Sequence, residues 1–192
     1  RAASLGSGDV VIDASTNQNV TLETQSSTTL TQNINLLGDD ATIKTGGTNA
    51  GGNITQITGT VSGTGQLIKD GAGTLSLTNN NTYKGGTDVQ NGTVSIARAA
   101  SLGSGAVTLN QDTVLETLSS TTLTQNINLL GDATIKTGGN NAVENITQIT
   151  STITEKDKQN GSSSLTKSGA GTLSLTADNG YKGNTTIAEG TL

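Results

Sequence analysis

The side chains able to do acid–base or metal chemistry are few and are spread along the chain. The 192 residues include 15 Asp and Glu and 10 Lys and Arg, but no His and no Cys. The chain therefore lacks the Ser-His-Asp and Cys-His catalytic pairs, disulfides, thiolate zinc sites and the commonest transition-metal ligand. Catalysis would need two facing carboxylates about 5–10 Å apart, one with a raised pKa, as in glycoside hydrolysis.

The acidic residues do not form such a site. Between two copies of a long repeat, two positions stay acidic and three do not: Glu23 matches Glu116 and Asp39 matches Asp132, whereas Asp9, Asp70 and Asp88 become Ala106, Ser168 and Thr186. Denser groups occur only at Asp39-Asp40 and in Glu155-Lys156-Asp157-Lys158. Because an active site should be unique, we interpret these as solvated turns and predict no enzyme activity, no catalytic residue and no cofactor.

Calcium is a second possibility for the same residues. Gly6-Ser7-Gly8-Asp9 resembles the Gly-Gly-x-Gly-x-Asp repeat of calcium-binding solenoids, but its spacing differs and the Asp is lost at Ala106. Turns such as Asp39-Asp40 could supply oxygen ligands to a hard cation. We favour ordinary turn residues and predict no metal site.

Other side chains recur at matched places in both copies. Tyr83 and Tyr181 are either sugar-stacking platforms or, as we favour, half-buried lids over the rung ends. The recurring lysines are the pairs Lys44/Lys136, Lys69/Lys167 and Lys84/Lys182. We expect these lysines to keep the surface soluble and to block edge pairing, with a polyanion-binding stripe as the alternative.

Two more features leave binding open, so the binding residues are unknown. Thr-x-Thr pairs occur at 29/31, 58/60, 122/124 and 152/154, and regular Thr ranks on a flat solenoid face can bind ice. Their irregular spacing favours ordinary exposed strand residues. The segment 155–161 is absent from the first copy and is expected to protrude as a loop, either as decoration or as a binding tip.

An internal sequence repeat determines how the strands that carry these side chains are arranged along the chain. TTLTQNINLLGD at 28–39 recurs identically at 121–132, and GAGTLSLT at 71–78 recurs at 169–176. We divide the chain into unit one, residues 1–97, and unit two, residues 98–192, as one continuous solenoid. Because unit two stops where unit one still continues, we expect the chain to be a fragment of a longer array.

Composition and periodicity predict an all-β fold. Thr, Gly, Asn and Ser number 36, 26, 19 and 18, and the chain has no Pro, Phe or Trp. Short runs such as 74–77 and 93–96 alternate apolar residues with Thr or Ser, with Gly and Asn between runs. A right-handed parallel β-helix needs few core residues per rung, and about 20 residues per rung predict about five rungs per unit. Ten rungs would span about 45–50 Å, and Asn53 and Asn145 are candidates for side-chain ladders.

Charge excludes two classes of partner. The formal net charge is −5 with no basic cluster, so neither nucleic acid nor an anionic membrane is an expected partner. No apolar stretch approaches the roughly 20 residues needed to cross a bilayer, so we predict no membrane insertion of this segment.

Segment 71–110 resembles the autotransporter-associated β-strand repeat, also called the passenger-associated transport repeat. The matching residues are Gly71, Gly73, Thr74, Leu75, Leu77, Asn81, Thr82, Tyr83, Gly85, Gly86, Thr87, Gly92, Thr93, Leu102, Gly103 and Gly105. A second match over 169–192 departs at Gly180 and Asn184. The resemblance implies a β-helical passenger of type V secretion, extracellular on a Gram-negative cell surface and exported through an outer-membrane translocator barrel.

Three functions remain at this stage. The favoured one is a non-catalytic stalk whose rungs template folding and export, space a distal functional part from the surface and pair with adjacent repeats of the same parent chain. Exposed rung edges would then make the chain associate end to end. The alternatives are a self-associating adhesive surface that mediates cell-cell aggregation or biofilm formation, and a polysaccharide-active β-helix enzyme.

Overall fold

The computed structural model describes residues 5–16, 19–39, 41–46, 51–139, 143–156 and 162–192, which form short parallel strands and one 3-10 turn, η3 (Ala99–Leu102). The strands are β1 (Val10–Asp13), β2 (Val20–Thr24), β3 (Thr28–Leu30), β4 (Ile34–Leu37), β5 (Ala41–Thr45), β6 (Ile54–Ile57), β7 (Val61–Gly63), β8 (Leu67–Asp70), β9 (Thr74–Leu77), β10 (Thr87–Val89), β11 (Thr93–Ile96), β12 (Val107–Leu109), β13 (Thr113–Thr117), β14 (Thr121–Leu123), β15 (Ile127–Leu129), β16 (Ala133–Thr137), β17 (Ile146–Ile149), β18 (Ile153–Glu155), β19 (Leu165–Ser168), β20 (Thr172–Leu175) and β21 (Thr185–Ile187).

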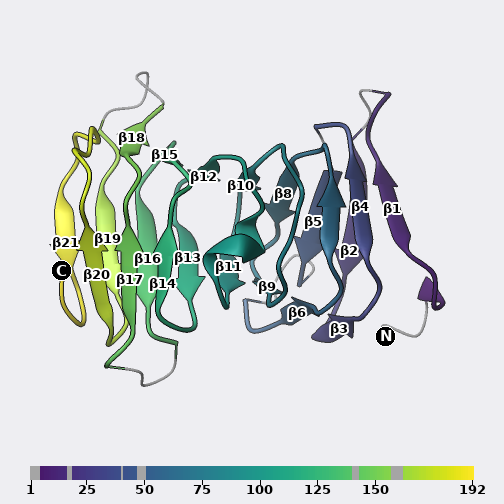
Figure 1. Cartoon of the computed structure of the whole chain (residues 1–192), viewed down its shortest axis with the longest axis horizontal. Coiled ribbons are helices and arrows are strands. Elements are labelled where there is room, and N and C mark those ends of the chain that lie inside the picture. The colour runs from purple at the N-terminus through teal and green to yellow at the C-terminus, as the bar shows by residue number, and fades with distance from the viewer. Residues whose placement is uncertain (1–4, 17–18, 40, 47–50, 140–142, 157–161) are drawn as a thin grey trace.

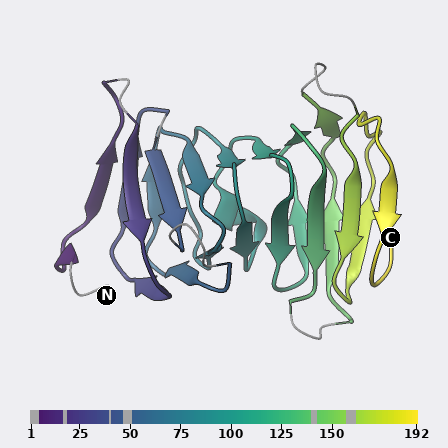
Figure 2. The same ribbon diagram turned by 180° about the vertical axis from the view of Figure 1, so that it is seen from behind.

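The chain winds through three faces in turn (Figures 1 and 2). Face one holds β1, β4 and β7 and, further along, β14, β17 and β20. Face two holds β2, β5, β8, β10, β12, β15 and β18, and face three holds β3, β6, β9, β11, β13, β16, β19 and β21. Neighbouring strands on each face pair in parallel, and β1 and β21 lie at opposite ends of the stack. The predicted parallel β-solenoid is confirmed.

Face one contains two irregular segments, 78–86 and 97–106, between β7 and β14. Backbone bonds still connect the rungs there: Thr82 N donates to Val61 O at 2.8 Å, and Ser104 N donates to Tyr83 O at 3.1 Å. The Gln125 side chain then donates to Gly103 O at 2.8 Å. The stacking direction is therefore continuous along the described part of the chain.

The core is a column of aliphatic side chains stacked rung upon rung. On face three, Leu75, Val94, Leu115 and Ile135 occupy one register position, and all four are fully buried. Alternate residues of each strand point inward, which is why apolar residues alternating with Thr or Ser suffice. Gly71 closes the turn after β8 with φ of 81°, a left-handed conformation in which a Cβ would also overlap the Thr45 carbonyl.

The rung count differs from the sequence-based expectation. Within the described residues, face three, the largest sheet, has eight strands where ten rungs were predicted. Eight strands at about 4.8 Å span roughly 34 Å. The error lies in the assumed rung length, because paired residues are 20 apart at Thr87 and Val107 but 32 apart at Ala133 and Leu165.

One unit is not a whole number of rungs. From β1 to its counterpart β12 the chain makes eleven strands and two irregular segments, thirteen segments in all, or four rungs and one further face. The identical sequence ATIKT therefore lies on face two as β5 and on face three as β16. Each unit repeats the previous one after a rise of about 21 Å and a turn of one face.

None of the described residues forms a helix that is long and apolar enough to cross a membrane.

Candidate functional site

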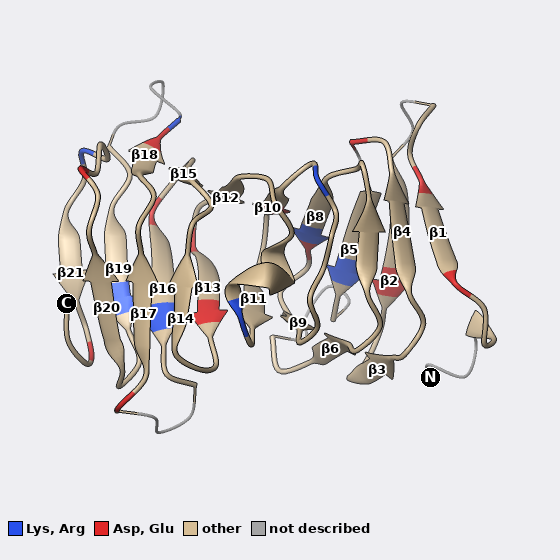
Figure 3. Ribbon diagram, viewed as in Figure 1, with Lys and Arg blue, Asp and Glu red and all other residues tan. Residues whose placement is uncertain are grey.

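The acidic candidates occupy the outer surface and pair with lysines of the next rung. Glu116 Oε1 lies 2.9 Å from Lys136 Nζ, and Glu23 Oε1 lies 3.8 Å from Lys44 Nζ. Figure 3 places these charges on the adjacent strands β13 and β16, and β2 and β5. These pairs place opposite charges side by side on neighbouring rungs.

Two of the acidic turn residues likewise accept hydrogen bonds from the neighbouring rung. Asp132 Oδ1 accepts a 2.7 Å bond from Ser164 N, and Asp9 Oδ1 accepts a 3.1 Å bond from the Asn33 side chain. Asp40 lies outside the described residues, so the Asp39-Asp40 pair is not placed. Across the parts of the chain that are described, no three acidic side chains gather as a metal site would require.

The lysine prediction is wrong for one of its three pairs. Lys44, Lys84, Lys136 and Lys182 reach the surface, but Lys69 and Lys167 are fully buried. Lys69 shares the inward side of β8 with Leu67, so the alternation of the strand already pointed it toward the interior. A lysine is almost never fully buried without partners, and the partners of these two become visible only in the folded chain.

Three backbone carbonyls surround each buried ammonium group. Lys69 Nζ donates to the carbonyls of Asp70 at 3.0 Å and Gly71 at 2.6 Å, and to Asn91 of the next rung at 2.9 Å. Lys167 Nζ makes the same three bonds, to Ser168 at 2.8 Å, Gly169 at 2.6 Å and Glu189 at 2.9 Å. An ammonium has three donors, so each is fully used to join two successive turns. Burial lowers the pKa of Lys69 to about 8.

Tyr83 is not the half-buried lid that we predict from the sequence, whereas Tyr181 is half-buried as predicted. Tyr83 is fully buried in the core, and its hydroxyl lies 2.6 Å from Thr87 Oγ1. Its ring fills the space where face one lacks a strand, and it contacts the place where a Cβ on Gly103 would be. Tyr181 makes the same 2.6 Å bond to Thr185 but stays partly exposed. A buried ring contacting a glycine of the next rung is a packing device and cannot stack on a sugar.

Asn81 is a rung connector that the sequence reasoning missed. Its Oδ1 accepts from Val61 N of the rung before at 2.8 Å, and its Nδ2 donates to Ser101 O of the rung after at 2.7 Å. The predicted ladder residues Asn53 and Asn145 instead donate to backbone carbonyls at 3.3 Å, so they do not stack on other Asn side chains. The sequence signal that could have found it is the recurrence of an Asn two residues before each Tyr, at Asn81 and Asn179.

The Thr-x-Thr pairs do not form one plane. Thr29 lies on face three, Thr122 on face one and Thr154 on face two, so these pairs cannot match an ice lattice together.

The predicted protruding loop at 155–161 is described only at its first two residues, because residues 157–161 lie outside the described part of the chain. Glu155 accepts a 3.1 Å bond from Ser163 N across its base.

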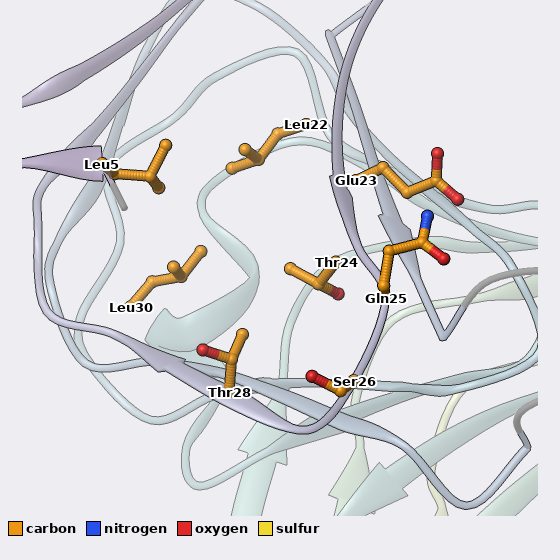
Figure 4. A pocket seen from close by; sticks show the side chains of 8 residues that line it. All are labelled: Leu5, Leu22, Glu23, Thr24, Gln25, Ser26, Thr28 and Leu30. Carbon is orange, nitrogen blue, oxygen red and sulfur yellow. The ribbon is translucent and has the colours of Figure 1, made fainter. Parts of the chain in front are cut away.

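A pocket of about 190 Å³ opens at the first rung, lined by Leu5, Leu22, Glu23, Thr24, Gln25, Ser26, Thr28 and Leu30. Figure 4 shows Leu5, Leu22 and Leu30 converging on the hollow. Leu30 is buried, as is its counterpart Leu123, whereas Leu5 and Leu22 are not buried although their counterparts Leu102 and Leu115 are. The pocket is thus the open end of the hydrophobic column rather than a cleft cut into its side.

Comparison with known proteins agrees with this architecture. A family described as Passenger-associated-transport-repeat matches residues 67–96 and 165–192. The adhesin BmaC autotransporter of Brucella suis biovar 1 (strain 1330) is 33% identical over 167 residues, which is 83% of this chain and 4% of that protein. No solved structure matches.

Both matched segments begin at a strand bearing a buried lysine, β8 or β19, and include the Asn and Tyr that join the rungs. The matched segments therefore contain side chains that join neighbouring rungs. The chain carries two passenger-associated transport repeats, at residues 67–96 and 165–192, within a parallel β-solenoid.

Proposed function

We propose that this chain is a non-catalytic stalk segment of a surface-exposed autotransporter passenger. The observation that carries the proposal is the continuous stacking of backbone bonds and core residues through the junction between the two units. The similarity to an autotransporter adhesin supports an extracellular location and an outer-membrane translocator barrel in the parent protein. We keep 1–97 and 98–192 as the proposed boundaries of the stacked units.

Folding would proceed by addition of rungs. Each new strand finds a complete row of backbone donors and acceptors on the preceding rung, so a segment that has paired is held against sliding back. The buried ammonium of Lys69, which bonds carbonyls of two rungs, and the two-sided bonds of Asn81 add side-chain connections at the same steps. The passenger-associated transport repeat would therefore serve both as spacer and as template.

Surface display of the parent protein tests this function. Leu115→Asp places a charge in the middle of the column, and we expect it to reduce display at least tenfold because rung addition stops there. Thr108→Asp, on an outward position of β12, is the matched control and should display normally. Equal display of both variants would contradict templating.

Removal of one whole unit tests the spacer role. The parent lacking residues 98–192 should be shorter by about 21 Å and should keep the binding affinity of its distal part in solution. Loss of that solution affinity would contradict a pure spacer and favour an adhesive role for the repeats.

A row of β-branched side chains on face three favours the adhesive alternative. Ile54, Thr74, Thr93, Val114, Thr134, Thr166 and Thr186 share one register line and are not buried. Such a flat row offers a regular surface to a like row on another cell. Under this alternative, Thr93→Lys with Thr134→Lys abolishes cell-cell aggregation, whereas Thr42→Lys with Thr108→Lys on face two does not.

A further inference from the structure

Asn followed directly by Gly occurs three times in the chain, at residues 91–92, 160–161 and 179–180. Residues 160 and 161 lie outside the described part, so the structure compares the other two pairs. Asparagine is chemically labile, because the backbone nitrogen of the following residue can attack its side-chain carbonyl carbon. Glycine hinders that attack least, because it has no Cβ. The surroundings of each Asn-Gly pair therefore decide whether its side-chain amide is lost.

The turn after β10 leaves the reacting atoms of Asn91 and Gly92 free. Asn91 is exposed, and within the described residues Gly92 N donates to no acceptor and Asn91 Oδ1 accepts no hydrogen bond. Both residues line a surface hollow of about 470 Å³, together with Lys44, Asp70 and Asp112, so water reaches them. The attacking nitrogen, the carbonyl carbon and water are thus all available at this turn.

Hydrogen bonds to the preceding rung hold the pair Asn179-Gly180. Gly180 N donates to Ile153 O at 2.8 Å, and Asn179 Oδ1 accepts from Ile153 N at 2.8 Å. Both bonds must break before Gly180 N can approach the side-chain carbon of Asn179, and each costs free energy when it is lost without a replacement. The fold therefore protects this second pair.

We propose that Asn91 is a deamidation site of the folded chain and that it reacts without an enzyme. Hydroxide removes the proton of Gly92 N, and this nitrogen forms a bond to Asn91 Cγ. The bond from Cγ to Nδ2 then breaks, and the amide nitrogen takes a proton from water and leaves as ammonia. Water opens the resulting cyclic imide at either carbonyl, which leaves aspartate or isoaspartate at position 91. The sum of these steps consumes water and releases ammonia.

The reaction changes a contact between two rungs. Asn91 Nδ2 donates to Asp70 Oδ1 at 2.7 Å, and Asn91 O accepts from the buried Lys69 Nζ at 2.9 Å. Aspartate at position 91 lacks the amide donor and places a second negative charge against Asp70. Unit two avoids this combination, because Glu189 stands at the position of Asn91 and Ser168 at that of Asp70. Deamidation therefore weakens the connection between these two turns of the first transport repeat.

Peptide mass spectrometry of the folded 192-residue chain tests the site. The chain is incubated at mildly alkaline pH and digested, and the conversion of each Asn-Gly peptide is followed with time. Residue 91 should convert at least tenfold faster than residue 179, because only the second site must first break its bonds to Ile153. In urea, where both sites lose their surroundings, the two rates should become similar. Equal rates in the folded chain, or faster conversion at Asn179, overturn the proposal.

A variant that carries the product tests the effect on the fold. Asn91→Asp should lower the melting temperature by about 2–4 °C, because it removes a donor and adds a charge beside Asp70. Asn91→Asp with Asp70→Ser restores one acidic and one neutral residue, as in unit two, and should regain most of the loss. Asn91→Gln keeps an amide and is the control that should show no fast conversion at this peptide. An Asn91→Asp chain that melts with the wild type, or a double variant that melts below Asn91→Asp, contradicts the weakened contact.

Discussion

The two transport repeats carry nearly the same residues in two different surroundings. The repeat at 67–96 has a full rung on both sides, whereas the repeat at 165–192 has a rung on one side. Tyr83 is consequently buried and Tyr181 partly exposed, although each makes the same 2.6 Å hydroxyl bond. The local conformation is thus set within the repeat, while burial comes from the next rung.

This comparison separates what a repeat does alone from what its neighbour adds. Lys69 and Lys167 make the same three bonds because their carbonyl partners lie within the matched segments themselves. Asn81 bonds rungs on both sides, whereas its counterpart Asn179 is seen to accept from Ile153 N at 2.8 Å on one side. Matched substitutions in the two repeats therefore measure the contribution of the covering rung.

Among matched substitutions in the two repeats, those of Tyr83 and Tyr181 should differ most in the unfolding free energy that they cost. Tyr83→Ala removes a fully buried ring and leaves a cavity, so it should lower the free energy of unfolding by about 3–5 kcal/mol. Tyr181→Ala removes a ring with one covered side and should cost about half as much. Urea denaturation of each variant gives both values, and equal losses would show that the covering rung adds nothing.

Gly103, which contacts the Tyr83 ring, and its counterpart Gly6, which contacts no ring, give the next largest difference in stability. Gly103→Ala forces a left-handed residue against Tyr83 and should cost about 2–3 kcal/mol. Gly6→Ala has the same backbone conformation with free space around it and should cost about 1 kcal/mol. Thermal unfolding of the pair checks the order, and a larger loss for Gly6→Ala would contradict it.

The buried lysine should make stability depend on alkaline pH. Burial lowers the pKa of Lys69 to about 8, below its ordinary value of 10.5, so between these values the unfolded chain binds more protons than the folded chain. Raising the pH through this window therefore stabilises the fold, by an amount on the order of 1–3 kcal/mol. Unfolding by urea at pH 7.5 and 10 measures the rise.

Lys69→Met is the control for this prediction. The variant lacks the titrating group, so its change in stability between pH 7.5 and 10 should be smaller than that of the wild type. An identical pH dependence in both proteins would assign the effect to other groups.

The smallest expected effect is at the ion pairs of the two units. Lys136 lies 2.9 Å from Glu116, and Lys44 lies 3.8 Å from Glu23, so a double-mutant cycle should give about 0.5 kcal/mol for the first pair and close to zero for the second. Both couplings should shrink in 0.5 M salt because the charges are partly exposed. A stronger coupling at Glu23 and Lys44 would contradict the ranking.

Much of the fold could be predicted from the residues alone. Alternating runs such as Thr74–Leu77 indicated strands, and Gly and Asn indicated turns, because strand periodicity and left-handed turn preference are local properties. The internal repeat required the strands to stack in register, and a chain without Phe or Trp favoured a narrow column over a wide sandwich. The composition, with neither His nor Cys, excludes the chemistry that depends on an imidazole or a thiolate.

The tertiary structure alone decided which face each strand occupies and which polar residues are interior. Each unit has thirteen segments distributed over three faces. A repeat length of about 97 residues does not give this number, because loops of different length make the rungs unequal. The burial of Lys69 and Lys167 depends on carbonyls that two successive turns bring together. Likewise, Tyr83 is a core residue because the next rung presents Gly103 above it, and such a contact exists only once the rungs have stacked.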